Sequence, residues 1–257
     1  MPNKSFVDYG QDAPGLRKGM FIGAIAGCLA VAASAAFLPS SWIKTALIVV
    51  GSLAALYGAF MGSYMTWASQ RGKLSTRDYL LNETTKLIGW NGNERVLDVG
   101  CGRGLLAIGA AKRLTTGTAT GIDIWSNEDQ AGNSPEAALA NAKRESVFEK
   151  IRIDTGDARA LPYQDQSMDL VLSHWVVHNL KDEADRIKVL DEMWRVTSSG
   201  GVIALADIEH VASYKAHFQN QGAKDITFNN GGLHASIMGL LSGGSFRPQM
   251  LILKRPS

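Results

Sequence analysis

Two long stretches without a charged residue constrain this 257-residue chain more than any other feature. Residues 19–38 and residues 45–69 contain no Asp, Glu, Lys or Arg. At a rise of 1.5 Å per residue, a helix of about twenty residues matches a hydrocarbon core of about 30 Å. The connection between them, PSSWIK, is short and polar, and Pro39 favours the end of a helix. We therefore predict two transmembrane helices that form an antiparallel hairpin.

The flanking charges predict the orientation of this hairpin. Arg17 and Lys18 precede the first stretch, residues 71–77 carry three basic residues, and Lys44 is the only charged residue between the stretches. Because basic residues stay on the cytoplasmic side, both termini are expected there. The alternative for the first stretch is a cleaved signal peptide, since SAAF resembles a cleavage site, but a second stretch follows at once. The prediction is a multi-pass protein of the cell membrane with a cytoplasmic catalytic domain.

Small residues recur at helical spacing within both stretches. Gly23 and Gly27 lie four residues apart in the first, and Gly58 and Gly62 in the second. This spacing allows close helix contact in lipid, either within one chain or between chains of an oligomer. The alternative is that these glycines are only tolerated in membrane helices.

Charge and cysteine content exclude two classes of function. The 26 basic and 24 acidic residues leave a net charge of +2, without the long basic block of a nucleic-acid surface. Nucleic acid is therefore not an expected partner. The two cysteines, Cys28 and Cys101, are too few for a disulfide framework or a cysteine-rich metal site.

The rest of the chain reads as an α/β domain. Strand and helix patterns alternate from RVLDVG to GVIALADI, which predicts a Rossmann-like, doubly wound and mostly parallel sheet. Two more strands are predicted in KDITFNN and PQMLILKR, while the glycine-rich residues 231–246 match no single pattern. The predicted domains are an N-terminal segment at 1–18, the hairpin at 19–69, a linker with an amphipathic helix at 70–92, and the α/β domain at 93–257.

The stretch VLDVGCGRGLL places glycines in the turn after the first predicted strand. Ligands of open α/β sheets approach this turn most closely. A nicotinamide-dependent oxidoreductase, the alternative enzyme class, requires the pattern G-x-G-x-x-G, but Leu105 occupies the position of the third glycine. Asp98 also places a carboxylate at the strand end, which suits a cationic amine better than a pyrophosphate. The observed glycines are Gly100, Gly102 and Gly104.

Acidic residues end two further strands. Asp123 lies about twenty residues beyond the glycines, where an acceptor binds ribose hydroxyls. Asp157 follows the third strand, where it can accept from the exocyclic amine of adenine. One Asp at a strand end is most often a turn or capping residue. Three in order, counting Asp98, indicate a nucleoside ligand that also carries an amine.

The motifs VLDVGCGRG, GIDIW, GDARALPYQDQSMDLVLSHWVVHNL and RVTSSGGVIALAD resemble the class I S-adenosylmethionine-dependent methyltransferases over most of residues 84–207. The resemblance implies S-adenosylmethionine as cofactor and S-adenosylhomocysteine as product. It implies that the backbone of the glycine loop packs against the methionine portion. The implied contacts are Asp98, Gly100, Gly102 and Gly104 with that portion, Asp123 with the ribose, Ile124 or Trp125 with the adenine face, Asp157 and Ala158 with the adenine edge, and Ser173 near the methionine end.

Candidate residues for the methyl acceptor follow the fourth strand. Helical spacing would place His174 and His178 on one face, where a neutral imidazole takes a proton from a hydroxyl or thiol. The alternative is that one or both only pack or form hydrogen bonds, and an amine acceptor needs no base. No metal is expected, because no third ligand stands at suitable spacing. Further candidates for the pocket are Trp175, Asn179, Tyr214 and His234.

Together these patterns predict a membrane-anchored S-adenosylmethionine-dependent methyltransferase that acts on a small or lipophilic acceptor. Methyl transfer is an in-line displacement, to which positioning can contribute roughly 7 to 11 kcal/mol. An anchor is useful when the acceptor partitions into the bilayer, although it can also hold the enzyme beside a partner. The alternative function is a non-catalytic, S-adenosylmethionine-binding membrane scaffold or sensor.

Overall fold

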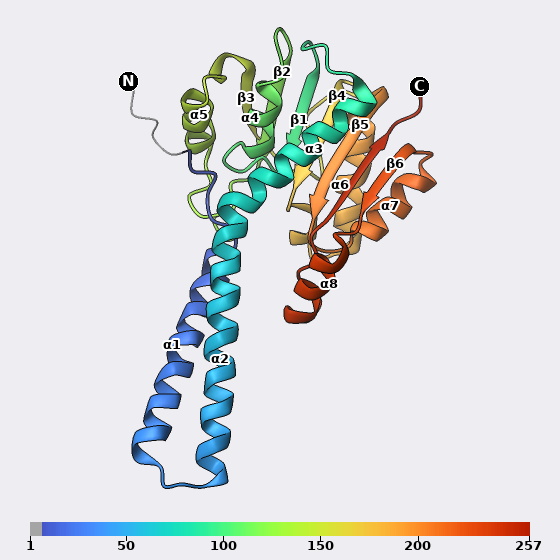
Figure 1. Cartoon of the computed structure of the whole chain (residues 1–257). Coiled ribbons are helices and arrows are strands. Elements are labelled where there is room, and N and C mark those ends of the chain that lie inside the picture. The colour runs from blue at the N-terminus through green and yellow to red at the C-terminus, as the bar shows by residue number, and fades with distance from the viewer. Residues whose placement is uncertain (1–6) are drawn as a thin grey trace. The chain divides into compact units, whose positions relative to one another are not determined.

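The structure is a computed structural model that describes residues 7–257, and the chain divides into two compact units (Figure 1). The hairpin unit consists of residues 10–73 and residues 126–132. The sheet unit consists of residues 7–9, 74–125 and 133–257. Each unit is described by itself.

The hairpin unit is built on α1 (Pro14–Phe37) and α2 (Trp42–Trp67). Pro14 stands in the first turn of α1, where its missing N–H costs no hydrogen bond. The Ser41 hydroxyl caps α2 by accepting from the Lys44 backbone N–H at 3.3 Å. The Lys44 ammonium donates to two carbonyl oxygens at the end of α1, at 2.9 and 3.1 Å. The two uncharged stretches therefore form helices joined by a short connection.

Glycines bring α1 and α2 into close contact. A Cβ at Gly27 would lie 2.6 Å from a carbonyl oxygen of α2, and one at Gly58 would lie 2.5 Å from a carbonyl oxygen of α1. A Cβ at Gly62 would meet a phenylalanine ring of α1 at 2.8 Å, whereas one at Gly23 would meet nothing within 4 Å. Three of the four predicted small residues thus serve contact within one chain.

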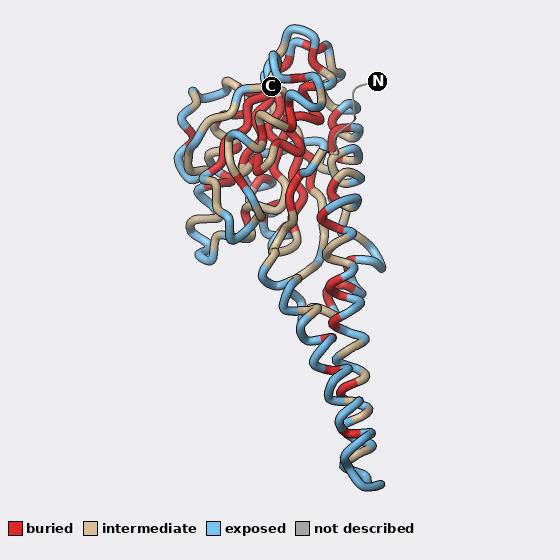
Figure 2. Tube along the Cα trace, turned by 90° about the vertical axis from the view of Figure 1, so that its left-hand side faces the viewer, coloured by how far each residue is buried: buried red, intermediate tan, exposed pale blue. Residues whose placement is uncertain are grey.

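Most other side chains of the hairpin are exposed (Figure 2). Of the most apolar 18 residues of α1, only 17% are buried. The corresponding share is 22% in the helical stretch that begins with α2. Both helices are long and apolar enough to cross a membrane. Most of the apolar surface of these two helices is therefore not covered by other parts of the hairpin unit.

Three segments meet at the base of the hairpin unit. Asp12 and Gln130 form an antiparallel β-bridge, and two neighbouring backbone hydrogen bonds of 3.0 Å join the same segments. Lys73 is 2% exposed, and its ammonium lies 2.9 Å from the Gly10 carbonyl oxygen and 2.9 Å from the Asp12 carboxylate. It follows η1 (Ala68–Gly72), a π-helical turn. The loop 126–132 therefore belongs to the hairpin unit, although it lies within the predicted α/β domain.

The sheet unit contains, among residues 7–257, a seven-stranded sheet of order β3-β2-β1-β4-β5-β7-β6. The first five strands in this order pair in parallel, and β7 and β6 pair antiparallel at one edge. The predicted Rossmann-like, mostly parallel sheet is confirmed. The strands are β1 (Arg95–Val99), β2 (Thr118–Asp123), β3 (Ile151–Thr155), β4 (Met168–His174), β5 (Thr197–Asp207), β6 (Lys224–Asn229) and β7 (Gln249–Lys254).

Helices cover both faces of the sheet. Alternate strand residues such as Val96 and Leu170 pack with α3, α4 and α5, and their neighbours such as Leu97 and Val171 pack with α6 and α7. A parallel sheet buried on both faces explains the nearly continuous apolar strands. The helices are α3 (Lys73–Ile88), α4 (Leu105–Ala111), α5 (Pro135–Arg144), α6 (Glu183–Val196), α7 (Val211–Asn220) and α8 (Gly232–Leu241), with 3₁₀ turns at Phe148–Lys150 and Val177–Asn179.

Residues before the hairpin also pack in the sheet unit. Tyr9 is 6% exposed within the core, and its hydroxyl donates to Glu145 at 3.2 Å. Asp8 forms an ion pair with Arg103 at 3.0 Å, and its carbonyl oxygen accepts from Asn141 at 2.9 Å. The predicted N-terminal segment 1–18 is thus divided between the units, and its first six residues lie outside the described part of the chain.

Candidate active site

The glycine loop lies at the carboxyl end of β1. Gly100, Gly102 and Gly104 have φ of +70°, +52° and +84°, a region that side chains with a Cβ rarely adopt. A Cβ at Gly100 would lie 2.3 Å from the side chain of Val176, which follows β4. The strand order reverses between β1 and β4, and such switch points hold the ligands of open α/β sheets. The Val176 side chain thus occupies the space of a Gly100 Cβ, and close approach of the loop to a ligand stays a prediction.

Asp98 lies buried beneath this loop. It is 2% exposed, and its carboxylate accepts from the Ala107 backbone N–H in α4 at 2.8 Å. Burial raises the pKa of Asp98 to about 7, with a further contribution from the charge of Asp123, while the bond from Ala107 opposes the rise. Asp98 therefore positions the start of α4, and its contact with a ligand amine stays a prediction.

Asp123 ties the glycine loop to the end of β2. Its carboxylate accepts from the Gly102 N–H at 2.8 Å, the Trp125 N–H at 2.7 Å and the Asn133 side chain at 3.2 Å. A carboxylate has about four lone-pair positions, so two ribose hydroxyls would have to replace one of these bonds. Ile124 beside it is 64% exposed and can present an apolar surface to adenine.

Trp125, the other candidate for the adenine face, is held by its own contacts. Its φ is +64°, and its indole N–H donates to the Thr155 hydroxyl at 2.8 Å. Its backbone N–H already donates to Asp123. This geometry favours Ile124 for the predicted contact, which stays a prediction.

Asp157 and Ala158 follow β3, as predicted. The Arg159 guanidinium binds both oxygens of Asp157, at 3.1 and 2.7 Å, and these bonds hold the pKa of Asp157 below its usual range. Ala158 packs against the core on the face of α6 and α7. The Asp157 side chain is 43% exposed, and its contact with an adenine amine stays a prediction.

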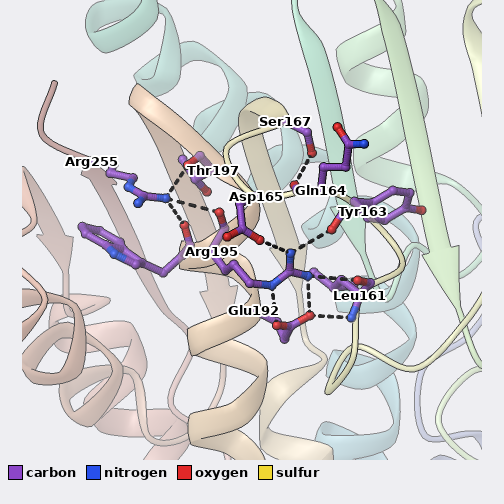
Figure 3. A network of polar contacts seen from close by, with 10 residues as sticks. Leu161, Tyr163, Gln164, Asp165, Ser167, Glu192, Arg195, Thr197 and Arg255 are labelled. Carbon is purple, nitrogen blue, oxygen red and sulfur yellow. Dashed lines mark hydrogen bonds and ion pairs between the residues drawn. The ribbon is translucent and has the colours of Figure 1, made fainter.

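Arg195 holds the loop that follows Asp157, a contact that the sequence analysis did not identify (Figure 3). Its guanidinium donates to the carbonyl oxygens of Leu161 at 3.0 Å and Tyr163 at 2.8 Å. It also pairs with Glu192 and Asp165, each at 2.7 Å. The predicted adenine edge therefore rests on a fixed loop.

Ser173 lies beside the glycine loop, but its hydroxyl forms a hydrogen bond within the sheet. It is 2% exposed and donates to the carbonyl oxygen of Val99, its neighbour in β1, at 3.1 Å. The position agrees with the predicted methionine end. A direct contact with the cofactor stays a prediction.

The two candidate histidines do not share a helical face. His174 is the last residue of β4 and stacks on Trp175, with ring centroids 4.8 Å apart. His178 lies in the 3₁₀ turn Val177–Asn179. The prediction from helical spacing is wrong, because the chain turns sharply at Trp175, whose φ is +57°.

His178 instead forms a pair with Asp207, the last residue of β5. Its Nδ1 hydrogen-bonds an oxygen of the Asp207 carboxylate, and its backbone N–H donates to the other oxygen at 3.1 Å. Asp207 is 1% exposed and also accepts from the Ile208 N–H at 2.9 Å. A carboxylate only accepts, so Nδ1 carries a proton, and in the neutral form of the ring the lone pair is on Nε2.

The sequence analysis missed Asp207, although the signal was present. Asp207 ends the buried strand VIALAD just as Asp123 ends β2, and Asp98 is the last residue but one of β1. Tyr214 packs nearby in the core, where burial, and then the charge of Asp207, raises the pKa of its phenol well above the usual value. His234 lies on α8. Among residues 7–257, no three His, Cys, Asp or Glu side chains group as a metal site.

Part of this chain is similar to known methyltransferases. Residues 97–205 match the family model of the methyltransferase domain. Methyltransferase GfsG of Streptomyces halstedii is 35% identical over 114 residues, which cover 44% of this chain and 37% of that protein. A demethylmenaquinone methyltransferase of Roseiflexus castenholzii is 33% identical over 114 residues, which cover 44% and 42%. The matches thus span less than half the length of these relatives.

A solved structure shows the same fold. Geranyl diphosphate C-methyltransferase from Streptomyces coelicolor, in complex with Mg²⁺, geranyl diphosphate and S-adenosylhomocysteine, superposes with a TM-score of 0.57 at 12% identity. The superposition covers 76% of this chain and 84% of that chain. At this identity the likeness concerns the fold alone.

Proposed function

We propose that this chain, whose residues 97–205 match the family model of the methyltransferase domain, is a membrane-anchored, S-adenosylmethionine-dependent methyltransferase for a small lipophilic acceptor. One observation carries the proposal. The glycine loop after β1 and the His178–Asp207 pair after β4 and β5 lie at the same carboxyl edge, around the switch point of the sheet. A cofactor site and a proton acceptor are thereby supported by neighbouring strands.

The residues at this edge fit S-adenosylmethionine. The left-handed glycines of the loop carry no side chain that would hold a ligand away from its backbone, and Asp123 keeps lone-pair capacity for a ribose hydroxyl. We assign Ile124 and Asp157 to the adenine, and the exposure of both side chains supports this assignment. When bound, the cofactor supplies an activated methyl group. The glycine loop, Asp98 and Ser173 would orient its methionine end.

His178 would serve as general base for a hydroxyl or thiol acceptor. Its Nε2 holds the lone pair, and Asp207 both orients the ring and stabilises the charge that the ring gains with a proton. Such a base typically contributes 10²- to 10⁴-fold in rate. His174, stacked on Trp175, would shape the acceptor side. An amine acceptor that is already neutral would need positioning alone.

The membrane part of the proposal rests on the hairpin. Its helices leave apolar side chains outside and bring glycines inside, which suits lipid. We place both termini and the sheet unit on the cytoplasmic side, because basic residues flank the outer ends of the helices and S-adenosylmethionine is a cytosolic solute. A lipophilic acceptor in the bilayer would make such an anchor useful.

Calorimetric titration of the detergent-solubilised full chain with S-adenosylhomocysteine, beside NADH, tests the cofactor site. Saturable binding of S-adenosylhomocysteine alone is expected, and Asp123→Ala should weaken it. Transfer of a labelled methyl group is then compared between lipid and aqueous cell extracts, with label expected in the lipid fraction. Label confined to the aqueous fraction contradicts a lipophilic acceptor, and binding with no transfer in either fraction supports the scaffold alternative. Binding of neither nucleotide refutes the proposal.

Cysteine accessibility in sealed vesicles tests the topology. Single cysteines at Ser40, in the connection between the helices, and at Thr116, exposed in the sheet unit, should react with a membrane-impermeant reagent from opposite sides. Reaction of both from the same side would contradict the hairpin topology.

A further inference from the structure

Helix α8 is apolar on both of its faces. Ala235 and Met238 are buried in the sheet unit. Leu233, Ile237 and Leu240 are 76%, 47% and 83% exposed, and their spacing of four and three residues places them on one outer face. The exposed polar residues His234 and Ser236 lie beside this outer stripe, so α8 carries one apolar stripe on each side. A helix normally buries an apolar stripe in a core or in lipid. The outer face of α8 therefore calls for an apolar environment.

This helix lies at the acceptor side of the candidate active site. Phe246, which follows α8, packs edge-on against Trp175 with ring centroids 5.7 Å apart. The Arg247 backbone N–H donates to the Ile208 carbonyl oxygen at 2.9 Å. Trp175 follows β4 and Ile208 follows β5, at the edge that carries the His178–Asp207 pair. Figure 1 shows α8 beyond the ends of these strands.

The charges around α8 suit a phospholipid surface. Residues 226–257 contain no Asp or Glu. Arg247 is exposed, and its side chain packs against α8 at Gly239, where a Cβ would lie 2.5 Å from Nε. A guanidinium beside an apolar face can bind a lipid phosphate while leucines enter the acyl region.

We infer that the outer face of α8 inserts into the bilayer interface and forms the entrance through which a lipophilic acceptor reaches the active site. The inference rests on the proposed membrane anchorage. Interfacial helices bury an apolar face about 5 to 10 Å into the boundary between headgroups and acyl chains. An acceptor could then move from the bilayer to the pocket without crossing water.

Two observations favour the bilayer over a second copy of the chain. Ser69 is the last residue of the uncharged stretch, and Leu74 is the first residue of the sheet unit after the hairpin. The five residue steps between them span at most about 18 Å, so this connection is short enough to keep the sheet unit within reach of a bilayer that holds the hairpin. The three exposed side chains also offer only roughly 300 Å² of apolar surface. A stable protein interface buries about 800 Å² per partner.

Site-specific fluorescence in vesicles tests the insertion. The full chain, with Cys28→Ala and the buried Cys101 retained, receives a single cysteine by Leu240→Cys and is labelled with a polarity-sensitive fluorophore. Val50→Cys reports the hairpin, and Thr116→Cys is the exposed control at the opposite edge of the sheet. Vesicles of phosphatidylcholine and phosphatidylglycerol carry either a nitroxide lipid or, outside, iodide. S-adenosylhomocysteine binding checks that each variant is folded.

We expect the label at position 240 to be quenched at least twofold by the nitroxide lipid and protected from iodide, as at position 50. The label at position 116 should respond to iodide alone. If position 50 is quenched by lipid but position 240 behaves like position 116, the inference about α8 fails while the anchorage stands. Protection from both quenchers at position 240 indicates a second copy and overturns the inference. If position 50 itself escapes the nitroxide lipid, the proposed anchorage fails.

Discussion

The hairpin and the sheet are both rich in apolar residues, but they place them in opposite ways. In β4 and β5 the apolar side chains point inward and are almost fully buried, whereas in α1 and α2 most of them point outward. At the centre of the hairpin stand glycines such as Gly27 and Gly58 instead. This difference shows that small residues identify the interior of the hairpin, whereas polar groups at strand ends identify the carboxyl edge of the sheet, where the candidate active site lies.

The largest effect is expected from Asp207→Asn, which tests the candidate active site at the carboxyl edge of the sheet. The amide no longer fixes Nδ1 as the protonated nitrogen of His178, so the rate of methyl transfer to a hydroxyl or thiol acceptor should fall by about 10² to 10⁴. The pH dependence of the rate should lose the limb that reports the base. The matched control is Asp191→Asn, because Asp191 forms a surface pair with His217 at 2.8 Å. Equal rates in the two variants would contradict the role of Asp207.

The second prediction concerns the pH dependence of stability. The pKa of Asp98 is raised to about 7 in the folded chain, against about 4 when unfolded. Between these values the folded state keeps a proton that the unfolded state has lost, so the free energy of unfolding falls as the pH rises from about 4 to about 7, by up to ~4 kcal/mol. Asp98→Asn should remove this part of the slope in thermal unfolding followed by near-UV circular dichroism. Parallel slopes for both proteins would refute the prediction.

The third prediction tests the bare backbone at the sheet edge. Gly100→Ala combines a left-handed residue with a clash against Val176, and we expect a cost of about 2 to 3 kcal/mol and at least tenfold weaker binding of S-adenosylhomocysteine. Gly89→Ala is the control, because its φ is also positive but its Cβ would meet nothing within 4 Å. Calorimetry and thermal unfolding measure both effects. A cofactor affinity unchanged in Gly100→Ala would show that the loop does not approach the ligand.

The smallest effect is expected in the hairpin itself. Gly58→Ala places a Cβ against a backbone carbonyl of α1, whereas Gly23→Ala meets open space. We expect a loss of about 1 kcal/mol in helix contact for the former alone, seen as faster hydrogen exchange in α1, with cofactor affinity unchanged. Similar exchange in the two variants would remove Gly58 from the contact.

The alternation of the strands could be read from the sequence because their apolar runs are short and bounded by glycines and charges. Asp98, Asp123 and Asp157 could be placed at strand ends for the same reason. The interactions that these three carboxylates form could not be predicted from the sequence. Asn133 and Arg195 reach the site from other elements, and only the fold brings those elements together.

The C-terminal part shows a second limit of sequence analysis. Residues 231–246 contain many glycines, which argue against a helix, yet α8 forms because Gly231 provides the left-handed start and Ala235 and Met238 find a core. Tertiary packing here overrides local propensity. Helical spacing also gave the wrong arrangement of His174 and His178, because the left-handed residue Trp175 between them changes the direction of the chain.

The packing of residues 7–9 into the sheet unit has a consequence for membrane topology. Asp8 and Tyr9 contact Arg103, Asn141 and Glu145, so a hairpin that crosses a membrane as proposed must return the chain to the side from which it started. The number of crossings between Tyr9 and Leu74 is therefore even, whatever the flanking charges. Cleavage within α1 would separate residues 7–9, which pack in the core of the sheet unit, from the rest of the chain. Insertion of both helices as a pair, as proposed, is compatible with the packing of residues from both sides of the hairpin into one unit.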